Sequence, residues 1–184
     1  MGLYFKEQTK FSSWSECKLE YIKRYDPPND LIAAHILQLK KCKDYAKPLG
    51  LGMALSIEHR YPELKGVDMI VPLPQHPDSI DKRGHNHAEE LSKIIGEHIN
   101  VSCDNEILRK TKDITMRGKG LNERQESVKG LYAPSVKQLN DETILLIDDL
   151  YTTGCNVNEC SKILKNIGAR VVYVLVAGRD APEY

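Results

Sequence analysis

The sequence has no net charge and no long apolar run. It carries 26 basic and 26 acidic side chains among 184 residues, so no global field directs it to nucleic acid or indicates an acidic tail. No apolar segment approaches the roughly 20 residues that a transmembrane helix requires. The first residues, MGLYFKEQTK, lack a signal-peptide core, and Lys6 stands where N-terminal acylation favours serine or threonine. These absences predict a soluble cytoplasmic protein.

Cysteine is present but lacks the spacing of a structural framework. The five residues are odd in number and form no C-x-x-C pair: Cys17, Cys42, Cys103, Cys155 and Cys160. Neither a disulfide scaffold nor a zinc ribbon is supported, and free thiols are the simpler interpretation. A nucleophilic role for Cys155 is not favoured, because no histidine partner is legible near it.

The pattern of polar and apolar residues changes near residue 66. The first 65 residues are polar and predict helices, over about 29–43 and 47–61, although two glycines weaken the second. Beyond them, short apolar strands (67–74, 143–147 and 170–177) alternate with helical patterns (86–99 and 156–168), and EILRK predicts a further short strand. Such alternation predicts βαβ units, and the nearly continuous apolarity of TILLI and VVYVLVA fits strands buried on both faces.

We therefore predict an α/β fold with a mostly parallel sheet between helices. Two parts are expected: an N-terminal helical subdomain over 1–65, and an α/β core over 66–184.

The segment ILLIDDLYTTG, residues 144–154, carries the clearest chemical signal. In parallel sheets, ligands bind beyond the carboxyl ends of strands, where Asp148 and Asp149 are expected. The small turn that follows leads into a helix whose free amides favour an anion, and Thr152 and Thr153 add hydroxyl donors. The segment suits a sugar phosphate. A plain helix entry and an aspartate Mg²⁺ site remain alternatives, whereas a nucleotide P-loop would need a lysine.

ILLIDDLYTTG resembles the ribose-phosphate fingerprint of type I phosphoribosyltransferases, which has four apolar residues, two acids, two variable residues and Thr-Thr-Gly. The resemblance implies that the acids hold the ribose hydroxyls of phosphoribosyl pyrophosphate while the turn wraps its 5-phosphate. It assigns the ribose and catalytic roles to Asp148 and Asp149. The phosphate role falls to Thr152, Thr153, Gly154, Cys155 and Asn156, although many relatives have a hydroxyl residue at position 156.

VPLPQHPDSIDKRGHNHAEELSKII is similar to the ComF/GntX-like branch of this family, whose pattern is VPxP followed by R-G-x-N-x-A-x-x-L. A later segment also matches at Leu121, Arg124 and Gly130, but departs at Met116 and Ser127. The resemblance spans about residues 66–178 and implies a type I phosphoribosyltransferase fold, with about five strands and an N-terminal hood. The four-cysteine zinc ribbon common in this branch is missing, so no metal role passes to Cys17 or Cys42.

The resemblance also implies Mg²⁺ as cofactor, held mainly through the substrate and water and not in a dedicated protein cage. Asp149 is in addition a candidate for proton transfer. The pyrophosphate would be bound by backbone amides and side chains of the loop after the first core strand, 73–77, and by a flexible cationic lid over 109–119, which would close to exclude water. A surface histidine, a structural Arg-Gly turn and a solvated charged loop are the simpler alternatives. The candidates are Gln75, His76, Arg83, Arg109, Lys110, Lys112, Arg117 and Lys119.

The expected function is Mg²⁺-dependent transfer of phosphoribose to a nitrogen acceptor, a base or an amine, with release of pyrophosphate. Residues 1–65 would build the acceptor side, and their sequence does not identify the acceptor. The alternative is a non-catalytic module of the ComF kind, which binds phosphoribosyl pyrophosphate or nucleotides in an accessory or regulatory role linked to DNA uptake. Expected partners are small molecules, with a homodimer as a possible assembly and with neither membrane nor nucleic acid.

Overall fold

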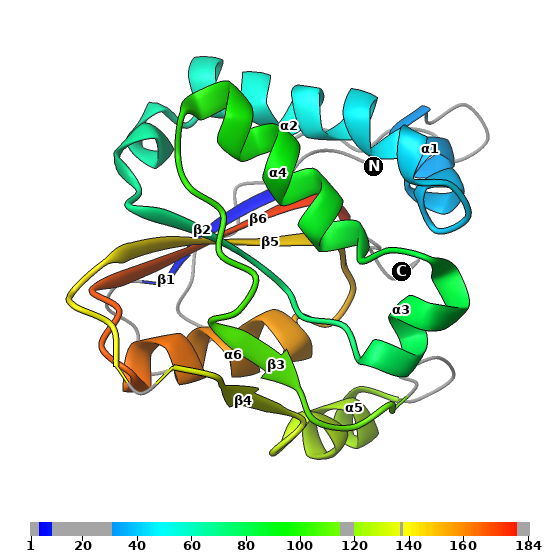
Figure 1. Ribbon diagram of the computed structural model, residues 1–184, viewed down its shortest axis with the longest axis vertical. Helices are drawn as coiled ribbons and strands as arrows, with labels where there is room; N and C mark the ends of the chain where they lie inside the picture. Colours follow the sequence, from blue (N-terminus) through cyan, green and yellow to red (C-terminus); the bar gives the residue numbers. More distant parts are fainter. Residues whose placement is uncertain (1–3, 9–30, 115–119, 137, 180–184) are drawn as a thin grey trace.

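The computed structural model describes residues 4–8, 31–114, 120–136 and 138–179. Its centre is a four-stranded sheet in the order β1-β6-β5-β2 (Figure 1). Strands β2 (Met69–Pro72), β5 (Thr143–Tyr151) and β6 (Val171–Arg179) are parallel, and β1 (Tyr4–Gln8) is antiparallel to β6. The predicted α/β fold with a mostly parallel sheet is confirmed.

Helices cover both faces of this sheet (Figure 1). One face carries α1 (Leu31–Leu39), α2 (Ala46–His59) and α4 (His87–Ile99). The other carries α6 (Cys155–Asn166), α5 (Leu121–Val128) and a small sheet of β3 (Leu108–Lys110) and β4 (Tyr132–Pro134). The connecting elements are the 3-10 helices η3 (Lys43–Tyr45) and η4 (Pro62–Gly66), and helix α3 (Pro77–Arg83).

The alternation of side chains along β5 divides the apolar core into two halves. Ile144 and Leu146 pack on the α6 side, whereas Leu145 and Ile147 pack on the α1–α2–α4 side. All four are completely buried, as expected for a parallel strand covered on both faces. The continuous apolar run that predicted this strand therefore reflects two cores that share one strand.

Strand β1 departs from the expectation that the first 65 residues are helical. It adds an antiparallel edge to the sheet, where Phe5 lies opposite Leu175. EILRK does form a strand, but β3 pairs with β4 outside the main sheet. The main sheet therefore has four strands where about five were expected. Among the described residues, the N-terminal part supplies both a strand and helices, and the division at residue 66 stays a prediction.

Gly50, one of the two glycines that weakened the prediction of α2, has a packing role. A Cβ at this position would lie 2.8 Å from Cγ2 of Ile94 on α4. Glycine therefore allows α2 and α4 to approach closely. This approach stabilises the helical layer above the site.

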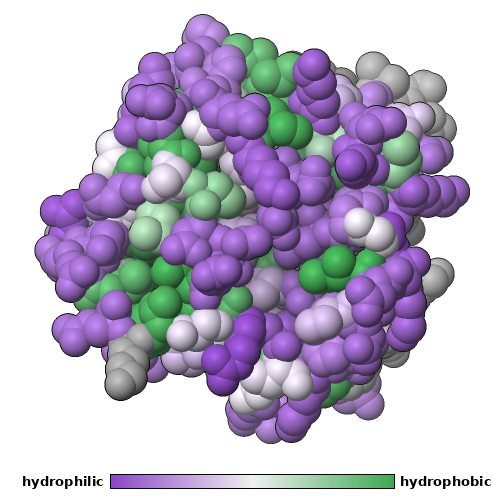
Figure 2. All heavy atoms as spheres, in the orientation of Figure 1, coloured by the Kyte–Doolittle hydropathy of each residue, from purple (hydrophilic) through white to green (hydrophobic). Residues whose placement is uncertain are grey.

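The visible surface is mainly hydrophilic, and its hydrophobic atoms lie in separate groups (Figure 2). Such a distribution is ordinary for a protein with balanced charge. Among the residues that the structure describes, none of the helices combines the length and apolarity that crossing a bilayer requires.

Candidate functional site

The site lies at the carboxyl ends of the parallel strands β2 and β5. The two strands are parallel, with Pro72 opposite Ile147, and the Leu73 amide donates to the Ile147 carbonyl at 2.8 Å. Strand β5 continues to Tyr151, so Asp148 and Asp149 belong to the strand and not to the loop beyond it. This pairing brings the loop of Gln75 beside the acid pair, as expected for the carboxyl ends of parallel strands.

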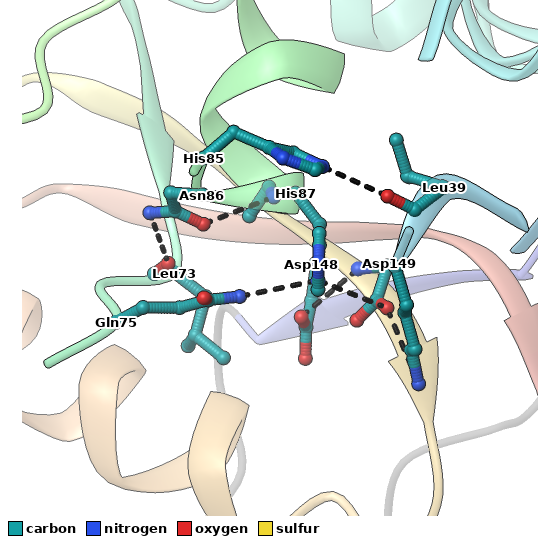
Figure 3. A network of polar contacts seen from close by, with 10 residues as sticks. Leu39, Leu73, Gln75, His85, Asn86, His87, Asp148 and Asp149 are labelled. Atoms are coloured by element: carbon teal, nitrogen blue, oxygen red, sulfur yellow. Dashed lines mark hydrogen bonds and ion pairs between the residues drawn. The ribbon is translucent and has the colours of Figure 1, made fainter. Parts of the chain in front are cut away.

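Asp148 and Asp149 form a closely coupled pair (Figure 3). The Asp149 amide donates to Oδ1 of Asp148 at 2.9 Å. Removal from water, followed by the negative charge of Asp149, raises the pKa of Asp148 well above its usual range. Oδ2 of Asp149 is buried without a hydrogen-bond partner, although Lys40 Nζ lies 3.6 Å from it. The pair thus offers acceptor oxygens to a ligand that brings hydroxyl donors.

The turn after β5 leads directly into α6. Gly154 precedes the helix with φ 75°, a left-handed conformation that glycine adopts without strain. Thr153 Oγ1 donates to Cys155 Sγ at 3.2 Å, and Arg124 Nη1 donates to Thr152 Oγ1 at 3.2 Å. The first amides of α6 therefore face a loop that also carries hydroxyls and a neighbouring guanidinium, which suits an anion.

This turn is nearly closed in the present conformation. Its cavity measures about 20 Å³ and is lined by residues 148 and 150–157, which is room for about one water molecule. Tyr151 accounts for part of this closure, because its ring lies against Gly154. A phosphate group would therefore require Tyr151 or the turn to move. Asn156 lines the same cavity, and its Oδ1 is buried without a partner.

His87 is a site residue that the sequence reasoning missed (Figure 3). Its side chain is 2% exposed; its Nδ1 lies 3.3 Å from Gln75 Nε2 and 3.8 Å from Asp149 Oδ2. Burial lowers the pKa of His87 to about 4 against the opposing charge of Asp149, so the imidazole is neutral near pH 7. The sequence signal was the H-N-H motif at residues 85–87, which was interpreted only as the start of a helix.

Lys40 was missed as well, together with the contact that positions it. The Leu39 carbonyl at the end of α1 lies 2.8 Å from His85 Nε2, and Lys40 follows it toward Asp149. The N-terminal helices thereby reach the acid pair. No local pattern could predict the approach of Lys40 to Asp149, because these two residues are more than 100 positions apart.

The predicted pyrophosphate residues divide into two groups. Gln75 belongs to the site through its contact with His87. Lys110 is half-buried, and burial lowers its pKa; the negative charge of Asp148 is among those that oppose this shift, so Lys110 lies within electrostatic reach of the acid pair. Arg109 instead donates to the Pro134 carbonyl at 2.9 Å. Arg83 ends α3, where its carbonyl lies 3.2 Å from His85 Nδ1. Lys112 is exposed, and Arg117 and Lys119 lie outside the described residues.

His76 lies beside Asp78 and Asp113. It begins α3 by accepting from the Asp78 amide at 3.3 Å. In the part of the chain that the structure describes, His76, Asp78 and Asp113 are the group of three side chains whose ligand atoms lie within 4.8 Å of one another. Lys82 Nζ approaches Asp113 to 3.5 Å and neutralises part of this charge. The group does not include Asp148 or Asp149.

The acid pair itself fits the Mg²⁺ that the resemblance implies. Asp148 and Asp149 present hard oxygen acceptors, and Oδ2 of Asp149 is buried without a donor. Mg²⁺ prefers oxygen ligands and retains several waters, which such carboxylates can hold in place. The donor set therefore suits a hydrated ion that arrives with an anionic ligand.

Comparison with curated proteins confirms the resemblance to ComF-like proteins. The chain is 29% identical over 127 residues to competence protein F of Haemophilus influenzae, which covers 67% of this chain and 56% of that protein. It is 32% identical over 104 residues to competence protein ComFC of Streptococcus pneumoniae, 56% of this chain and 44% of that one. The DNA utilization protein YhgH of Escherichia coli O157:H7 is 24% identical over 160 residues, which cover 85% of this chain and 70% of that protein.

The matches thus span about half the length of the first two relatives. No protein-family model matches the chain. Solved structures to which the chain shows similarity include an APRTase from Giardia lamblia, with a TM-score of 0.49 and 9% identity over 97% of this chain and 94% of that one. An orotate phosphoribosyltransferase from Aeropyrum pernix has a TM-score of 0.44 and 10% identity, with 94% and 85% covered. The α/β fold class itself follows from the parallel strands and their flanking helices.

Proposed function

We propose that the protein binds phosphoribosyl pyrophosphate with Mg²⁺ and transfers its phosphoribose to a nitrogen acceptor, releasing pyrophosphate. One observation carries the proposal: two adjacent carboxylates on β5 are followed within three residues by a Thr-Thr-Gly turn that opens α6. Carboxylates can accept from vicinal hydroxyls, and helix amides can donate to a phosphate. Both halves of a ribose phosphate therefore find partners on one short segment.

The chain's own residues would act mainly by binding and positioning. Asp148 and Asp149 orient the ribose and favour the positive charge that develops at its anomeric carbon. Lys110 on β3 lies close enough to Asp148 for the two charges to interact, and the following segment would bring further cations over the pyrophosphate and exclude water. When bound, Mg²⁺ would neutralise charge on the leaving pyrophosphate. The N-terminal part would supply the acceptor side, since Lys40 already reaches Asp149.

The names of the relatives favour a second candidate. Competence protein F and ComFC are named for competence, so an accessory module that binds phosphoribosyl pyrophosphate or a nucleotide without catalysis is the alternative. Both candidates require the donor site. They differ in whether the bound ligand loses its pyrophosphate.

Two measurements on the wild-type chain test the proposal in order. Calorimetry with phosphoribosyl pyrophosphate should show binding that requires Mg²⁺, with ribose 5-phosphate as a weaker reference ligand. A screen of bases and amines should then identify an acceptor that releases pyrophosphate. Absence of binding would contradict both candidates, whereas tight binding without release from any acceptor would favour the accessory module.

Arg124 provides a prediction that concerns the phosphate alone. Arg124→Gln should weaken the binding of ribose 5-phosphate by about tenfold, because a guanidinium–phosphate contact is worth about 1.5–3 kcal/mol and glutamine keeps part of the hydrogen bonding. Calorimetry on both proteins measures this change. Lys129→Gln is the matched control, since Lys129 follows the same helix and pairs with Glu126 at 2.7 Å. Equal losses of affinity in the two variants would show that the effect comes from net charge and not from a contact between Arg124 and the phosphate.

A further inference from the structure

Three buried polar atoms without hydrogen-bond partners come from three elements at the site. They are Oε1 of Gln75 after β2, Nε2 of His87 at the start of α4, and Oδ2 of Asp149 on β5. Figure 3 shows these side chains converging on the His87 ring. Buried polar groups without partners are costly and rare in folded proteins. Their convergence therefore indicates an arrangement with a role in the site.

The His87 ring is held rigidly in this position. Asn86 caps α4 by accepting from the Ala88 amide at 3.1 Å, and its Nδ2 donates to the Leu73 carbonyl at 3.2 Å. The ring of His85 packs edge-on against His87 with centroids 5.0 Å apart. The imidazole is thus fixed between the β2 loop and the acid pair, and its Nδ1 faces both Gln75 and Asp149.

The position of the imidazole proton is coupled to the orientation of the Gln75 amide. If the amide NH₂ faces Nδ1, Nδ1 must accept, and its lone pair then also faces the Asp149 carboxylate. If Nδ1 carries the proton, the ring can donate toward Asp149 and the Gln75 carbonyl can turn to the ring. The second arrangement gives Oε1 a donor and removes the unfavourable contact between a lone pair and an anion. A carboxylate beside one ring nitrogen commonly selects this tautomer.

We propose that His87 is a positioning residue for Asp149. It carries its proton on Nδ1, donates it to the Gln75 carbonyl as the nearer partner, and faces the same N–H toward the negative charge of Oδ2. Oδ2 then lies between His87 Nδ1 at 3.8 Å and Lys40 Nζ at 3.6 Å, which fixes the carboxylate plane that ligand hydroxyls meet. The Gln75 NH₂ group is left as a donor on the far side of its amide. The effect on a sugar ligand rests on the proposed function, whereas the tautomer does not.

The tautomer can be measured without any ligand. Nitrogen-15 chemical shifts of the His87 ring should show the proton on Nδ1 in the wild-type chain. Asp149→Ala should move it to Nε2, because the selecting carboxylate is gone. Lys40→Gln should leave it on Nδ1, because Lys40 contacts Asp149 and not the ring. A wild-type proton on Nε2, or a tautomer that ignores Asp149→Ala, would overturn the inference.

The positioning role is measured by the affinity for phosphoribosyl pyrophosphate with Mg²⁺. His87→Asn places an amide near the position of Nδ1 and should bind within about threefold of wild type, whereas His87→Leu should lose about tenfold. Inorganic phosphate should bind to both variants as it does to wild type. Full affinity in the leucine variant, or a tenfold loss in the asparagine variant, would contradict positioning; the asparagine result decides alone if the leucine variant does not fold. A wild-type chain that binds no phosphoribosyl pyrophosphate would count against the proposed function, and the nitrogen-15 shifts would then decide the role of His87.

Discussion

Replacing Asp148 and Asp149 together by asparagine should abolish the binding of phosphoribosyl pyrophosphate and should also make the fold more stable. A hydrogen bond to a charged group contributes about 1.5–3 kcal/mol, so losing both carboxylates should weaken binding by more than about a hundredfold. Asparagine keeps the shape of both side chains, and its Oδ1 at position 148 can still accept from the amide of residue 149. Calorimetry with Mg²⁺ present measures the loss.

The gain in stability follows from the environment of Asp148. Burial and the charge of Asp149 raise its pKa well above the usual range, so the folded chain holds this proton more tightly than the unfolded chain does. The carboxyl therefore stabilises the fold below its ordinary pKa, and this stability is lost as the pH rises through the raised value. Asparagine does not titrate, so the double variant should not lose stability as the pH rises. At pH 7 it should be more stable than wild type by about 1 kcal/mol, as is common when a residue that serves function at the expense of stability is replaced. Urea unfolding between pH 4 and pH 8 measures both effects.

A matched control separates the site from simple loss of negative charge. Asp44→Asn with Asp141→Asn removes two carboxylates from exposed positions. This control should bind like wild type and should show no gain in stability at neutral pH. Retained affinity in the Asp148/Asp149 variant would overturn the assignment of the donor site.

Local sequence was sufficient to predict the elements that frame the site. TILLI predicted β5 because its last four residues, 144–147, are all apolar, and the structure buries these four in two cores. The boundary was less accurate: β5 runs through Asp148 and Asp149 to Tyr151 and pairs with β6 along the way, for example Leu150 with Gly178. Backbone pairing with β6 continues where the apolar pattern ends, and only the neighbouring strand can reveal that continuation.

The remainder of the site depends on contacts between distant segments. Lys40 reaches Asp149 because α1 ends above the sheet, and His87 reaches it because α4 starts beside β2. Lys40 has no local feature that marks it, and the H-N-H sequence that contains His87 is compatible with an ordinary helix start. Strand β1 was missed for a related reason: YFKEQ is short and mostly polar, and its pairing partner β6 lies more than 160 residues later. The roles of the acid pair and of the turn stay predictions.

Gly154→Ala should destabilise the fold and weaken phosphate binding through Tyr151. An added Cβ would lie 2.6 Å from Cζ and 2.8 Å from Cε2 of the Tyr151 ring, closer than atoms in folded proteins approach. Overpacking of this kind costs about 1–3 kcal/mol, and a left-handed alanine adds about 1 kcal/mol. The ring or the start of α6 must shift, so ribose 5-phosphate should bind at least about tenfold more weakly. Urea unfolding and calorimetry measure the two losses.

Gly130→Ala isolates the contribution of the ring. Gly130 has φ 66°, close to the 75° of Gly154, but a Cβ there would meet nothing within 4 Å. This control should lose about 1 kcal/mol of stability from the backbone alone and should bind ribose 5-phosphate normally. Adding Tyr151→Ala to Gly154→Ala should then recover most of the difference between the two glycine variants, because the contact is removed from its other side. A double variant that binds no better than Gly154→Ala would show that the turn needs the glycine backbone itself, independently of Tyr151.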